Sequence, residues 1–427
     1  MLFAERVGES APLTDSDLKD AFRGALEAIE SRRSLRRVLV VPPDITRYHS
    51  RAGVLTQWAW EYLGERLTDV LPAIGTHAAM TPDEIREMYG AVPQELFRVH
   101  RWRDDLDQLG EVSPAVVKEL SDGLVDFSWP AQVNKLISQG GHDLILSVGQ
   151  VLPHEVVGMA NYNKNIFIGT GGHTGINLSH YLGAVCGIEN ILGRAHTPVR
   201  ALLNYATDTF ASHLPIVYAL TVVGIGPDGR PETRGLFVGD DIECYEKAAA
   251  FAQKHNLFMV DRPLDKVVAY LDPSEFRSTW LGNKAVYRTR MAIADGGELI
   301  VLAPGLKEFG EDPTIDMLIR RHGYFGTPAT AEKVKNDPEL AAMLGAAAHL
   351  MQGSSEGRFS ITYAPGHVTQ KEIEGVGFAY ADLAETLERY NPEKLTAGYN
   401  TLHDGEEVYY VPNPALGLWA HESRFSP

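Results

Sequence analysis

Cysteine is scarce in this chain of 427 residues, which contains only Cys186 and Cys244. Two cysteines in unrelated contexts support neither a disulfide framework nor a thiolate metal site. Positive charge is also in short supply, because 39 Lys and Arg against 56 Asp and Glu leave a formal net charge of −17. Nucleic-acid surfaces normally carry a basic stripe, so this balance argues against a nucleic-acid partner. It does not exclude an anionic substrate, since a few local basic residues can set the field in one cleft.

Long apolar stretches are absent as well. No run approaches the roughly 18 residues needed to cross a bilayer, so no membrane segment is expected. The first residues, MLFAERVGESAPLTDSD, carry acids where a secretory signal peptide has a basic and then an apolar stretch. We therefore expect a cytoplasmic protein without a membrane partner.

The chain does contain a regular alternation of apolar, β-branched stretches with amphipathic ones. Its length and its hydrophobic content of 44% are enough for two domains, each with its own core. This alternation predicts α/β domains with parallel or mixed, helix-covered sheets. A boundary near residue 265 would give an N-terminal domain over residues 1–265 and a C-terminal domain over 266–427. Strands are predicted over residues 36–44, 69–75, 143–148, 165–168, 215–223, 267–271, 298–304, 359–363 and 407–410, and helices over 18–32, 54–66, 241–255, 274–294, 314–321, 330–351 and 382–389.

Two local signals are sharper than the rest. Thr81 is followed by Pro82 and, three residues after the threonine, by Glu84, which predicts a capped helix start. The stretch GPDGR, residues 226–230, follows an apolar strand and favours a hairpin turn.

Three histidines and a lysine fall in turn-like segments that follow buried strands. His77 ends DVLPAIGTH, His154 ends DLILSVGQVLPH, and Lys164 and His180 lie in NYNKNIFIGTGGHTGINLSH. Open α/β sheets collect ligand-binding groups at the ends of buried strands. Imidazoles and an amine there can supply a metal ligand, two proton-transfer groups and a covalent anchor, so the pattern indicates an enzyme. Taken singly, each residue is more often a surface or core side chain, and no H-E-x-x-H zinc motif is present.

Two further segments are typical of phosphate binding or of ordinary turns. Asp44, Thr46 and Arg47 follow a strand end in PPDITRYHS. There Asp can hold ribose hydroxyls while Thr and Arg hold a phosphate, and the alternative is an Asx turn with a surface arginine. The stretch GTGGHTG, residues 169–175, is similar to a phosphate-cradling loop. It matches neither a P-loop nor G-x-G-x-x-G, and glycines of ordinary turns explain it equally well.

Together these segments resemble the nickel-dependent lactate racemase family of 2-hydroxyacid racemases and epimerases. The D-x-T-R element of that family is matched by residues 44–47, and its GTHRP-like turn is matched by GTHAAM around His77. The family has a histidine, a lysine ten residues later and a histidine sixteen residues after that. His154, Lys164 and His180 repeat this spacing. The match covers most of the chain in order.

A fourth landmark lies in the C-terminal part of the chain. The family has a lysine about a dozen residues before a Gly-Gly that opens a strand, and Lys284 stands in that place ahead of Gly296 and Gly297. The resemblance implies that Lys284 meets the substrate from the second domain. It also implies an active site in the cleft between the two domains.

The resemblance implies a nickel-pincer nucleotide as cofactor, a pyridinium mononucleotide whose ring carbon and two sulfur-bearing arms hold nickel. Lys164 would be tethered to it through a thioamide, and His180 would be the protein's nickel ligand in a square-planar site. Asp44, Thr46 and Arg47 would hold the ribose and phosphate. Accessory maturation proteins must make this cofactor, so they are expected partners.

The resemblance also implies that His77 and His154 are paired acid/base residues on opposite faces of the substrate carbon. The α-hydrogen of a 2-hydroxyacid is very weakly acidic, so direct deprotonation is difficult. Moving a hydride to the cofactor instead creates a planar 2-keto acid that can take the hydride back on either face. Each face then needs a base for the hydroxyl proton, and imidazole titrates near working pH.

The chain departs from the family pattern around the expected substrate. The family's GGRK run is NYNK here, residues 161–164, and the Arg and Pro of GTHRP are Ala78 and Ala79. A glutamine three residues before the substrate lysine is Leu281. These changes favour a 2-hydroxyacid other than lactate, such as a longer sugar acid.

Two alternatives of different classes remain open. The first is a nucleotide-binding protein that keeps the fold and phosphate contacts without redox chemistry. The second is a zinc or iron hydrolase built from His77, His154 and His180. No carboxylate stands obviously paired with these histidines in the sequence, which counts against the hydrolase.

Overall fold

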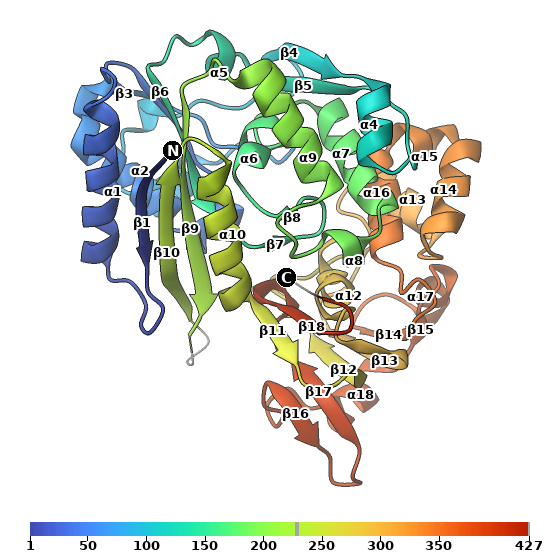
Figure 1. The fold of residues 1–427 in the computed structure, drawn as a ribbon. Helices are drawn as coiled ribbons and strands as arrows, with labels where there is room; N and C mark the ends of the chain where they lie inside the picture. The colour runs from blue at the N-terminus through green and yellow to red at the C-terminus, as the bar shows by residue number, and fades with distance from the viewer. Residues whose placement is uncertain (227–229, 426–427) are drawn as a thin grey trace. The chain divides into compact units, whose positions relative to one another are not determined.

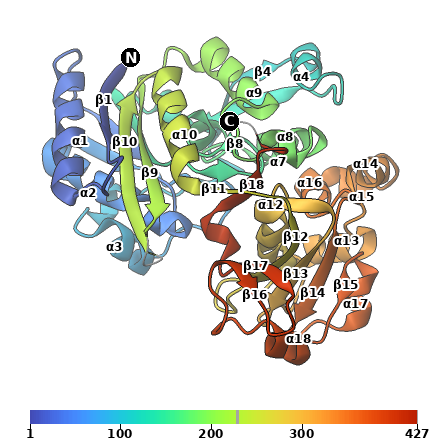
Figure 2. The same cartoon turned by 60° about the horizontal axis from the view of Figure 1, so that its bottom comes forward.

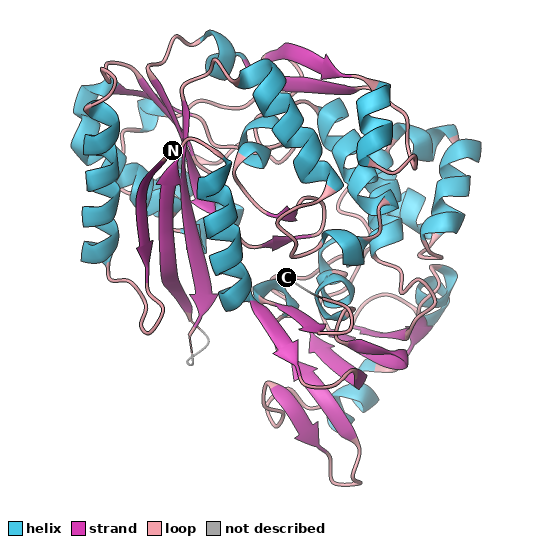
Figure 3. Ribbon diagram, in the orientation of Figure 1, coloured by secondary structure: helices cyan, strands magenta, loops and turns pink. Residues whose placement is uncertain are grey.

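The computed structural model describes residues 1–226 and 230–425, which form two compact units (Figure 1). The first unit consists of Met1–Ser179 and Leu192–Asn256, and the second of His180–Ile191 and Leu257–Pro427. Each unit has a six-stranded sheet with helices packed against it (Figure 3). This arrangement confirms the predicted α/β class with mixed, helix-covered sheets.

The sheet of the first unit has four parallel strands and an antiparallel edge. Strand β9 is parallel to β6, β6 to β2 and β2 to β3, whereas β10 is antiparallel to both β9 and β1. In spatial order the strands are β1 (Leu2–Val7), β10 (Pro231–Gly239), β9 (Ile216–Ile225), β6 (Leu144–Gln150), β2 (Val38–Val41) and β3 (Leu67–Val70). Two antiparallel pairs lie outside this sheet: β4 (Leu106–Val112) with β5 (Trp129–Asn134), and β7 (Pro153–His154) with β8 (Gly158–Met159).

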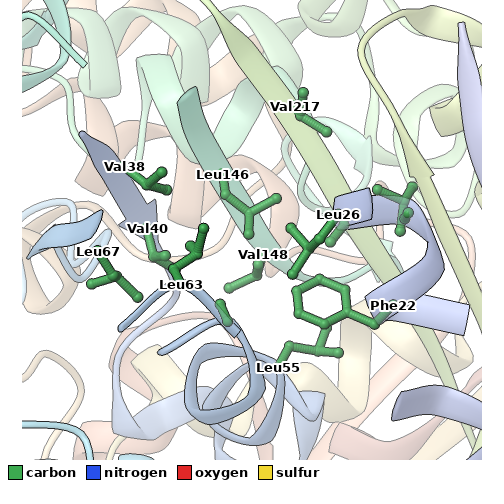
Figure 4. Close-up of a cluster of buried hydrophobic side chains, with 14 of the residues drawn as sticks. Phe22, Leu26, Val38, Val40, Leu55, Leu63, Leu67, Leu146, Val148 and Val217 are labelled. Carbon is green, nitrogen blue, oxygen red and sulfur yellow. The ribbon is translucent and has the colours of Figure 1, made fainter. Parts of the chain in front are cut away.

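Alternation along the strands assigns the two faces of this sheet to different helices. One face packs Leu26 of α1 and Leu55 of α2 against Leu146 of β6, in a cluster of buried aliphatic and aromatic side chains (Figure 4). The other face carries Phe237 of β10 against Phe251 of α10, with ring centroids 5.9 Å apart. The helices that begin in this unit are α1 (Asp15–Glu30), α2 (Ala52–Leu63), α3 (Pro82–Tyr89), α4 (Pro114–Leu120), α5 (Lys135–Gln139), α6 (Asn163–Phe167), α7 (His173–Val185), α9 (Pro198–Ala206) and α10 (Ile242–Asn256).

The second unit has four parallel contacts and one antiparallel edge strand. Its order is β15 (Ala379–Tyr380), β14 (Ser360–Pro365), β13 (Ile293–Ala303), β12 (Leu264–Tyr270), β17 (Glu407–Val411) and β16 (Gly398–Thr401), with β16 antiparallel. A separate parallel pair joins β11 (Leu257–Val260) to β18 (Leu418–His421). The unit also contains α8 (Ile188–Ile191), α11 (Thr279–Gly282), α12 (Lys284–Thr289), α13 (Pro313–His322), α14 (Thr327–Asn336), α15 (Pro338–Ala342), α16 (Leu344–Gln352), α17 (Gln370–Gly375) and α18 (Leu383–Arg389).

The helices of the second unit cover both faces of its sheet. Helix α18 lies against one face (Figure 2). Its Leu383 and Leu387 pack on the buried cluster that contains Ile300 and Leu302 of β13. On the other face, the hydroxyl of Tyr363 in β14 donates to Asn283 Oδ1 at 2.7 Å, just before α12.

Most predicted elements are present, and the helix start at Thr81 is confirmed in detail. The Thr81 side chain accepts from Glu84 N, the Glu84 side chain accepts from Thr81 N, and Pro82 is the first helical residue. The predicted turn at residues 226–230 includes 227–229, which lie outside the described residues. The strands on either side of it, β9 and β10, are antiparallel neighbours.

Three element predictions are wrong. Residues 165–168, predicted as a strand, belong to the short helix α6 and its end. The helix predicted over 274–294 is reduced to α11 and α12, and the one predicted over 330–351 is split into α14, α15 and α16. Pro338 explains the second break, because a proline at the first position of α15 cannot continue α14. Among the described residues, no helix combines the length and apolar character needed to cross a bilayer.

Candidate active site

Three neighbouring parallel strands, β6, β2 and β3, end at the same edge of the first sheet. Strand β2 leads through α2 to β3 on one side, whereas β6 leads on to β9 on the other side. This reversal makes the ends of β2 and β6 a topological switch point, where open α/β sheets bind ligands. Asp44 follows β2, His77 follows β3 and His154 follows β6. The sheet therefore brings the three predicted segments to one edge.

Asp44 is the centre of a small hydrogen-bonded cluster at this edge. Its carboxylate accepts from Thr46 N at 3.1 Å and from the Thr46 hydroxyl, and Oδ2 lies 2.7 Å from His77 Nδ1. Burial raises the pKa of Asp44, but the hydrogen bonds from His77 and Thr46 outweigh it, so the pKa lies below its ordinary value. The local turn is an Asx turn, which the sequence left open as the alternative to a nucleotide contact. Arg47 next to it is exposed.

The Asp44–His77 pair supplies the carboxylate partner that the sequence did not reveal. Since ionised Asp44 can only accept, His77 donates its Nδ1 proton, and neutral His77 keeps an unprotonated Nε2. The side chain of His77 is 62% exposed, so this nitrogen is accessible. This is the arrangement of an oriented general base.

The His77 segment is held to the segment that carries Lys164. Gly75 N donates to Gly169 O at 2.8 Å, just past α6. Gly75 has φ +58°, in the left-handed region that favours glycine. On the other side, Ala73 N donates to Pro42 O at 2.7 Å and thereby extends the pairing of β2 with β3. These contacts fix the turn that carries His77.

Helix α6 lies directly over the switch point. The buried amide of Asn165 donates to Val41 O at the end of β2 (3.0 Å) and to Ser147 Oγ in β6 (2.9 Å). Lys164, the residue before this anchor, is half-buried. Nothing in the sequence marked Asn165, because asparagines next to glycine-rich turns are common and its two partners are remote.

Lys164 has an unusual electrostatic environment. Burial lowers its pKa, and the neighbouring Arg47 and Arg200 lower it further, while Glu155 and Asp44 act in the opposite direction. The resulting pKa is about 8. About a tenth of the amine is therefore neutral at pH 7, far more than for an ordinary lysine. A neutral amine is the nucleophilic form.

His154 presents the opposite tautomer to His77. It closes the short strand β7, and its Nδ1 accepts from Val156 N at 3.1 Å. Neutral His154 therefore carries its proton on Nε2. Of the two predicted bases, His77 thus has an unprotonated Nε2 and His154 an Nε2–H. Neutral His77 can therefore accept a proton at Nε2, whereas neutral His154 offers a hydrogen-bond donor at Nε2.

The remaining two predicted residues belong to the second unit. His180 lies on α7, the helix that begins at His173, and is half-buried. Lys284 is the first residue of α12, with its Nζ 5.8 Å from the centroid of the Phe276 ring.

The glycines of GTGGHTG are packing positions. A Cβ on Gly169 would lie 2.7 Å from Ala73 Cβ, and one on Gly171 would overlap Phe167 O. A Cβ on Gly172 would lie 2.3 Å from Gln132 Oε1. None of these three has a positive φ. Neighbouring atoms lie so close to these three positions that a Cβ would not fit, so only glycine is accommodated there. The ordinary-turn interpretation therefore explains these glycines.

A buried chain of hydrogen bonds in the second unit was not predicted. The Thr279 hydroxyl donates to Phe309 O, so the Tyr324 hydroxyl, 2.8 Å away, donates to Thr279. His349 Nε2 then donates to Tyr324 (2.9 Å), and the Tyr287 hydroxyl donates to His349 Nδ1 (2.6 Å). No short motif signals this chain, because its members come from four separate elements.

A cavity of about 390 Å³ in the second unit is lined by Cys186, Glu189, Arg290 and Met351 among others, but by none of the predicted site residues. Within residues 1–226 and 230–425, no three or more His, Cys, Asp or Glu side chains form a group that could hold a metal ion. The three-histidine hydrolase alternative therefore gains no support.

Comparison with known families gives further evidence on the type of protein. The family model of the lactate racemase N-terminal domain matches residues 15–190, which include every predicted site residue except Lys284. Residues 15–190 are therefore similar to the N-terminal domain of lactate racemases. No curated protein matches the sequence.

Two solved structures share the fold of this chain. One is a protein from Thermotoga maritima, a structural genomics target, with a TM-score of 0.78 and 22% identity. The other is the lactate racemase apoprotein from Thermoanaerobacterium thermosaccharolyticum, with a TM-score of 0.70 and 16% identity. Each comparison covers 98% of this chain and 100% of the other. At these identities the likeness is one of fold.

Proposed function

We propose that this protein is a racemase or epimerase that inverts the 2-carbon of a 2-hydroxyacid with a nickel-pincer nucleotide. The observation that carries the proposal is the cluster at the switch point. His77 follows β3 and is paired with Asp44, which follows the neighbouring β2. His154, of opposite tautomer, and Lys164, with a lowered pKa, follow β6 on the other side of β2. The match to the lactate racemase N-terminal domain supports the isomerase class.

The residues at this edge fit such a cofactor. Lys164 supplies a partly neutral amine, which suits a covalent thioamide tether. The exposed guanidinium of Arg47 suits a phosphate, and Asp44 and Thr46 suit ribose hydroxyls or the phosphate edge. His180 would provide the single imidazole that a square-planar nickel site takes from the protein. The role of Lys284 as a substrate contact is part of the same proposal.

When bound, the cofactor would supply a hydride acceptor and donor. The protein's own residues handle the protons. His77, held by Asp44, takes the hydroxyl proton of one isomer at Nε2, and the carboxylate stabilises the imidazolium that forms. His154, once protonated from solvent to the imidazolium, returns its Nε2 proton to the keto oxygen on the product side and is left neutral. In the reverse direction the two histidines exchange roles.

The substrate is proposed to be a 2-hydroxyacid larger than lactate. Ala78 and Ala79 follow His77 where the resembling family carries Arg and Pro, and both are exposed. Small side chains there leave room beside the base that longer side chains would fill. Leu281 replaces a polar glutamine near Lys284, which removes a hydrogen-bonding group. A sugar acid suits these changes better than a three-carbon acid.

The proposal is tested with protein matured alongside the cofactor-making enzymes. The variants are His77→Ala and His154→Ala, with His196→Ala as the matched control, because His196 is 73% exposed and lies 3.7 Å from the Glu246 carboxylate, away from the cluster. We expect nickel and a visible charge-transfer band in all three. Isomer interconversion should persist in the control and fall at least about 100-fold in each other variant.

Half-reactions sharpen the test. His77→Ala and His154→Ala should each still transfer hydride from the isomer whose base remains. Each variant should therefore fail with the isomer that the other variant still converts. Complete loss of both half-reactions in both variants, with nickel retained, would contradict the two-base assignment. Matured protein that binds the nucleotide without nickel or redox chemistry would favour the nucleotide-binding alternative, and zinc in place of nickel would favour the hydrolase.

A further inference from the structure

Arg200 of α9 carries its charge into the interior of the first unit. It is 1% exposed, and no salt bridge joins it to an Asp or Glu within the described residues. A buried charge is costly unless it is paired and fully hydrogen-bonded. The guanidinium instead lies 4.2 Å from the centroid of the Tyr245 ring, which offers a cation–π contact.

The donors of Arg200 are directed at the segment that precedes and begins α6. Its Nη2 donates to Met159 O at 2.7 Å and to Asn161 O at 3.2 Å. Its Nη1 donates to Asn163 Oδ1, one residue before Lys164. Its Nε is buried without a hydrogen-bond partner in the described part of the chain. The hydrogen bonds of the fork therefore converge on one short stretch of chain.

That stretch is strained. Asn161 and Tyr162 are consecutive non-glycine residues with φ of +66° and +59°. Such residues cost of the order of 1–3 kcal/mol each and persist only where surrounding contacts impose them. The Tyr162 ring stacks on Tyr245 with centroids 5.2 Å apart, so Arg200 and this aromatic pair together impose the conformation.

Lys164 is the next residue but one after this strained pair. The charged groups near its amine are Arg47, Glu155, Arg200 and Asp44. Arg47 is exposed and therefore screened by solvent, whereas Arg200 is buried and its field is screened less. The same arginine thus sets both the backbone path of Lys164 and part of the field at its amine.

We propose that Arg200 is a positioning residue for Lys164, holding the Asn161–Asn163 backbone so that the lysine amine is placed at the switch point. This inference rests on the proposed function for its purpose, since a cofactor tether needs a nucleophilic amine. Its physical content concerns the protein alone. It holds for the protein before any cofactor is bound.

The test is the pH profile of Lys164 acetylation by trace acetic anhydride, followed by peptide mass spectrometry. In this reaction the neutral amine attacks the anhydride carbonyl, acetate leaves, and the amine proton passes to solvent. The full chain, expressed without the maturation enzymes, is labelled between about pH 6 and about pH 11, which spans ordinary and lowered lysine pKa values. The exposed Lys118 of α4 serves as an internal reference in every sample.

In the wild-type chain, Lys164 labelling should rise with a midpoint near 8. Arg200→Met should move the midpoint upward, and a midpoint higher by about one pH unit means about tenfold less labelling at neutral pH. Arg200→Lys keeps the charge but cannot make the bidentate contacts, so we expect a low midpoint with a reduced plateau rate. Lys118 labelling should be unchanged in both. Arg47→Gln should raise the Lys164 midpoint without lowering the plateau rate. This variant therefore distinguishes the effect of a nearby charge on the Lys164 pKa from the effect of backbone placement on the labelling rate.

Unchanged Lys164 profiles in both Arg200 variants, with the fold intact, would overturn the proposal. If Arg200→Met does not fold, an unaltered midpoint and plateau in Arg200→Lys would do the same. The result is separable from the proposed function. A matured protein without nickel would refute the enzyme assignment and leave the Lys164 labelling profile as it is. Lys164 profiles that the Arg200 substitutions do not change, in a protein that is an active enzyme, would refute only the role of Arg200.

Discussion

His77 and His100 have the same side chain in different surroundings. His77 is mostly exposed and bonded to a carboxylate, whereas His100 is buried and held by Gly171 O at 3.0 Å and the Asn134 amide at 3.1 Å. Burial lowers the pKa of His100, as expected for an imidazole that stays neutral in the core. Among fifteen histidines in the sequence, only the surroundings separate a candidate base from a structural residue.

Replacing Asp44 by Asn tests the cluster at the switch point at the level of one side chain. The folded-state pKa of Asp44 lies below its ordinary value of 3.8, so the ionised form favours the folded state. This contribution is complete well above pH 3.8 and is lost as the pH falls through the lowered value. We expect Asp44→Asn to reduce the free energy of unfolding by about 1–3 kcal/mol at neutral pH.

Urea unfolding at several pH values measures this effect. The difference between wild type and Asp44→Asn should shrink as the pH falls below the ordinary carboxyl range. A difference that stays constant across the acid range would mean that the lost stability comes from packing and not from the carboxylate.

At the scale of elements, α6 is where the sequence was most misleading. Residues 165–168 are short and apolar, a pattern that strands and buried helix turns share. The helix forms because Asn165 bonds to the ends of two strands and because Arg200 imposes a left-handed entry before it. Both partners are distant in sequence, so periodicity could not distinguish the two outcomes.

Two glycine-to-alanine changes contrast a packed glycine with an open one. Gly169→Ala would place a Cβ 2.7 Å from Ala73 Cβ and 2.4 Å from Asn165 O, so the contact between α6 and the His77 segment must open. We expect a loss of about 1–3 kcal/mol. Gly24→Ala meets nothing within 4 Å in the interior of α1, and should stabilise by up to about 1 kcal/mol.

The free energy of unfolding and the acetylation of Lys164 can be measured on both variants. Gly24→Ala should leave Lys164 labelling unchanged, whereas Gly169→Ala should alter it. Equal stability changes of the same sign in the two variants would contradict the packing role of Gly169.

Each of the two units has a buried hydrophobic cluster of its own against its six-stranded sheet. Leu146 of β6 and Leu302 of β13 are both fully buried, one in each cluster. Leu146→Ala and Leu302→Ala should each cost about 2–5 kcal/mol, through lost apolar contacts and the cavity left behind. Because each cluster belongs to one unit, each change should act mainly on its own unit.

Hydrogen exchange read by peptide mass spectrometry checks this prediction. Leu146→Ala should reduce protection of β2, β6 and β9 far more than that of β12, β13 and β14, and Leu302→Ala should do the reverse. Equal loss of protection in both sheets for either variant would mean that the two units unfold as one.

Much of this protein is readable from the order of its residues. Short-range patterns specified most strands and helices, the capping box at Thr81, and the segments that carry His77, His154 and Lys164, because these depend on neighbours within a few residues. The Asp44–His77 pair, the Asn165 anchor and the Arg200 fork were decided by the tertiary structure alone. Their partners lie between 18 and 124 residues apart, and only the pairing of parallel strands brings them to one edge. Charge, burial and tautomer at a site are properties of those long-range contacts, so they follow from the fold and not from any local pattern.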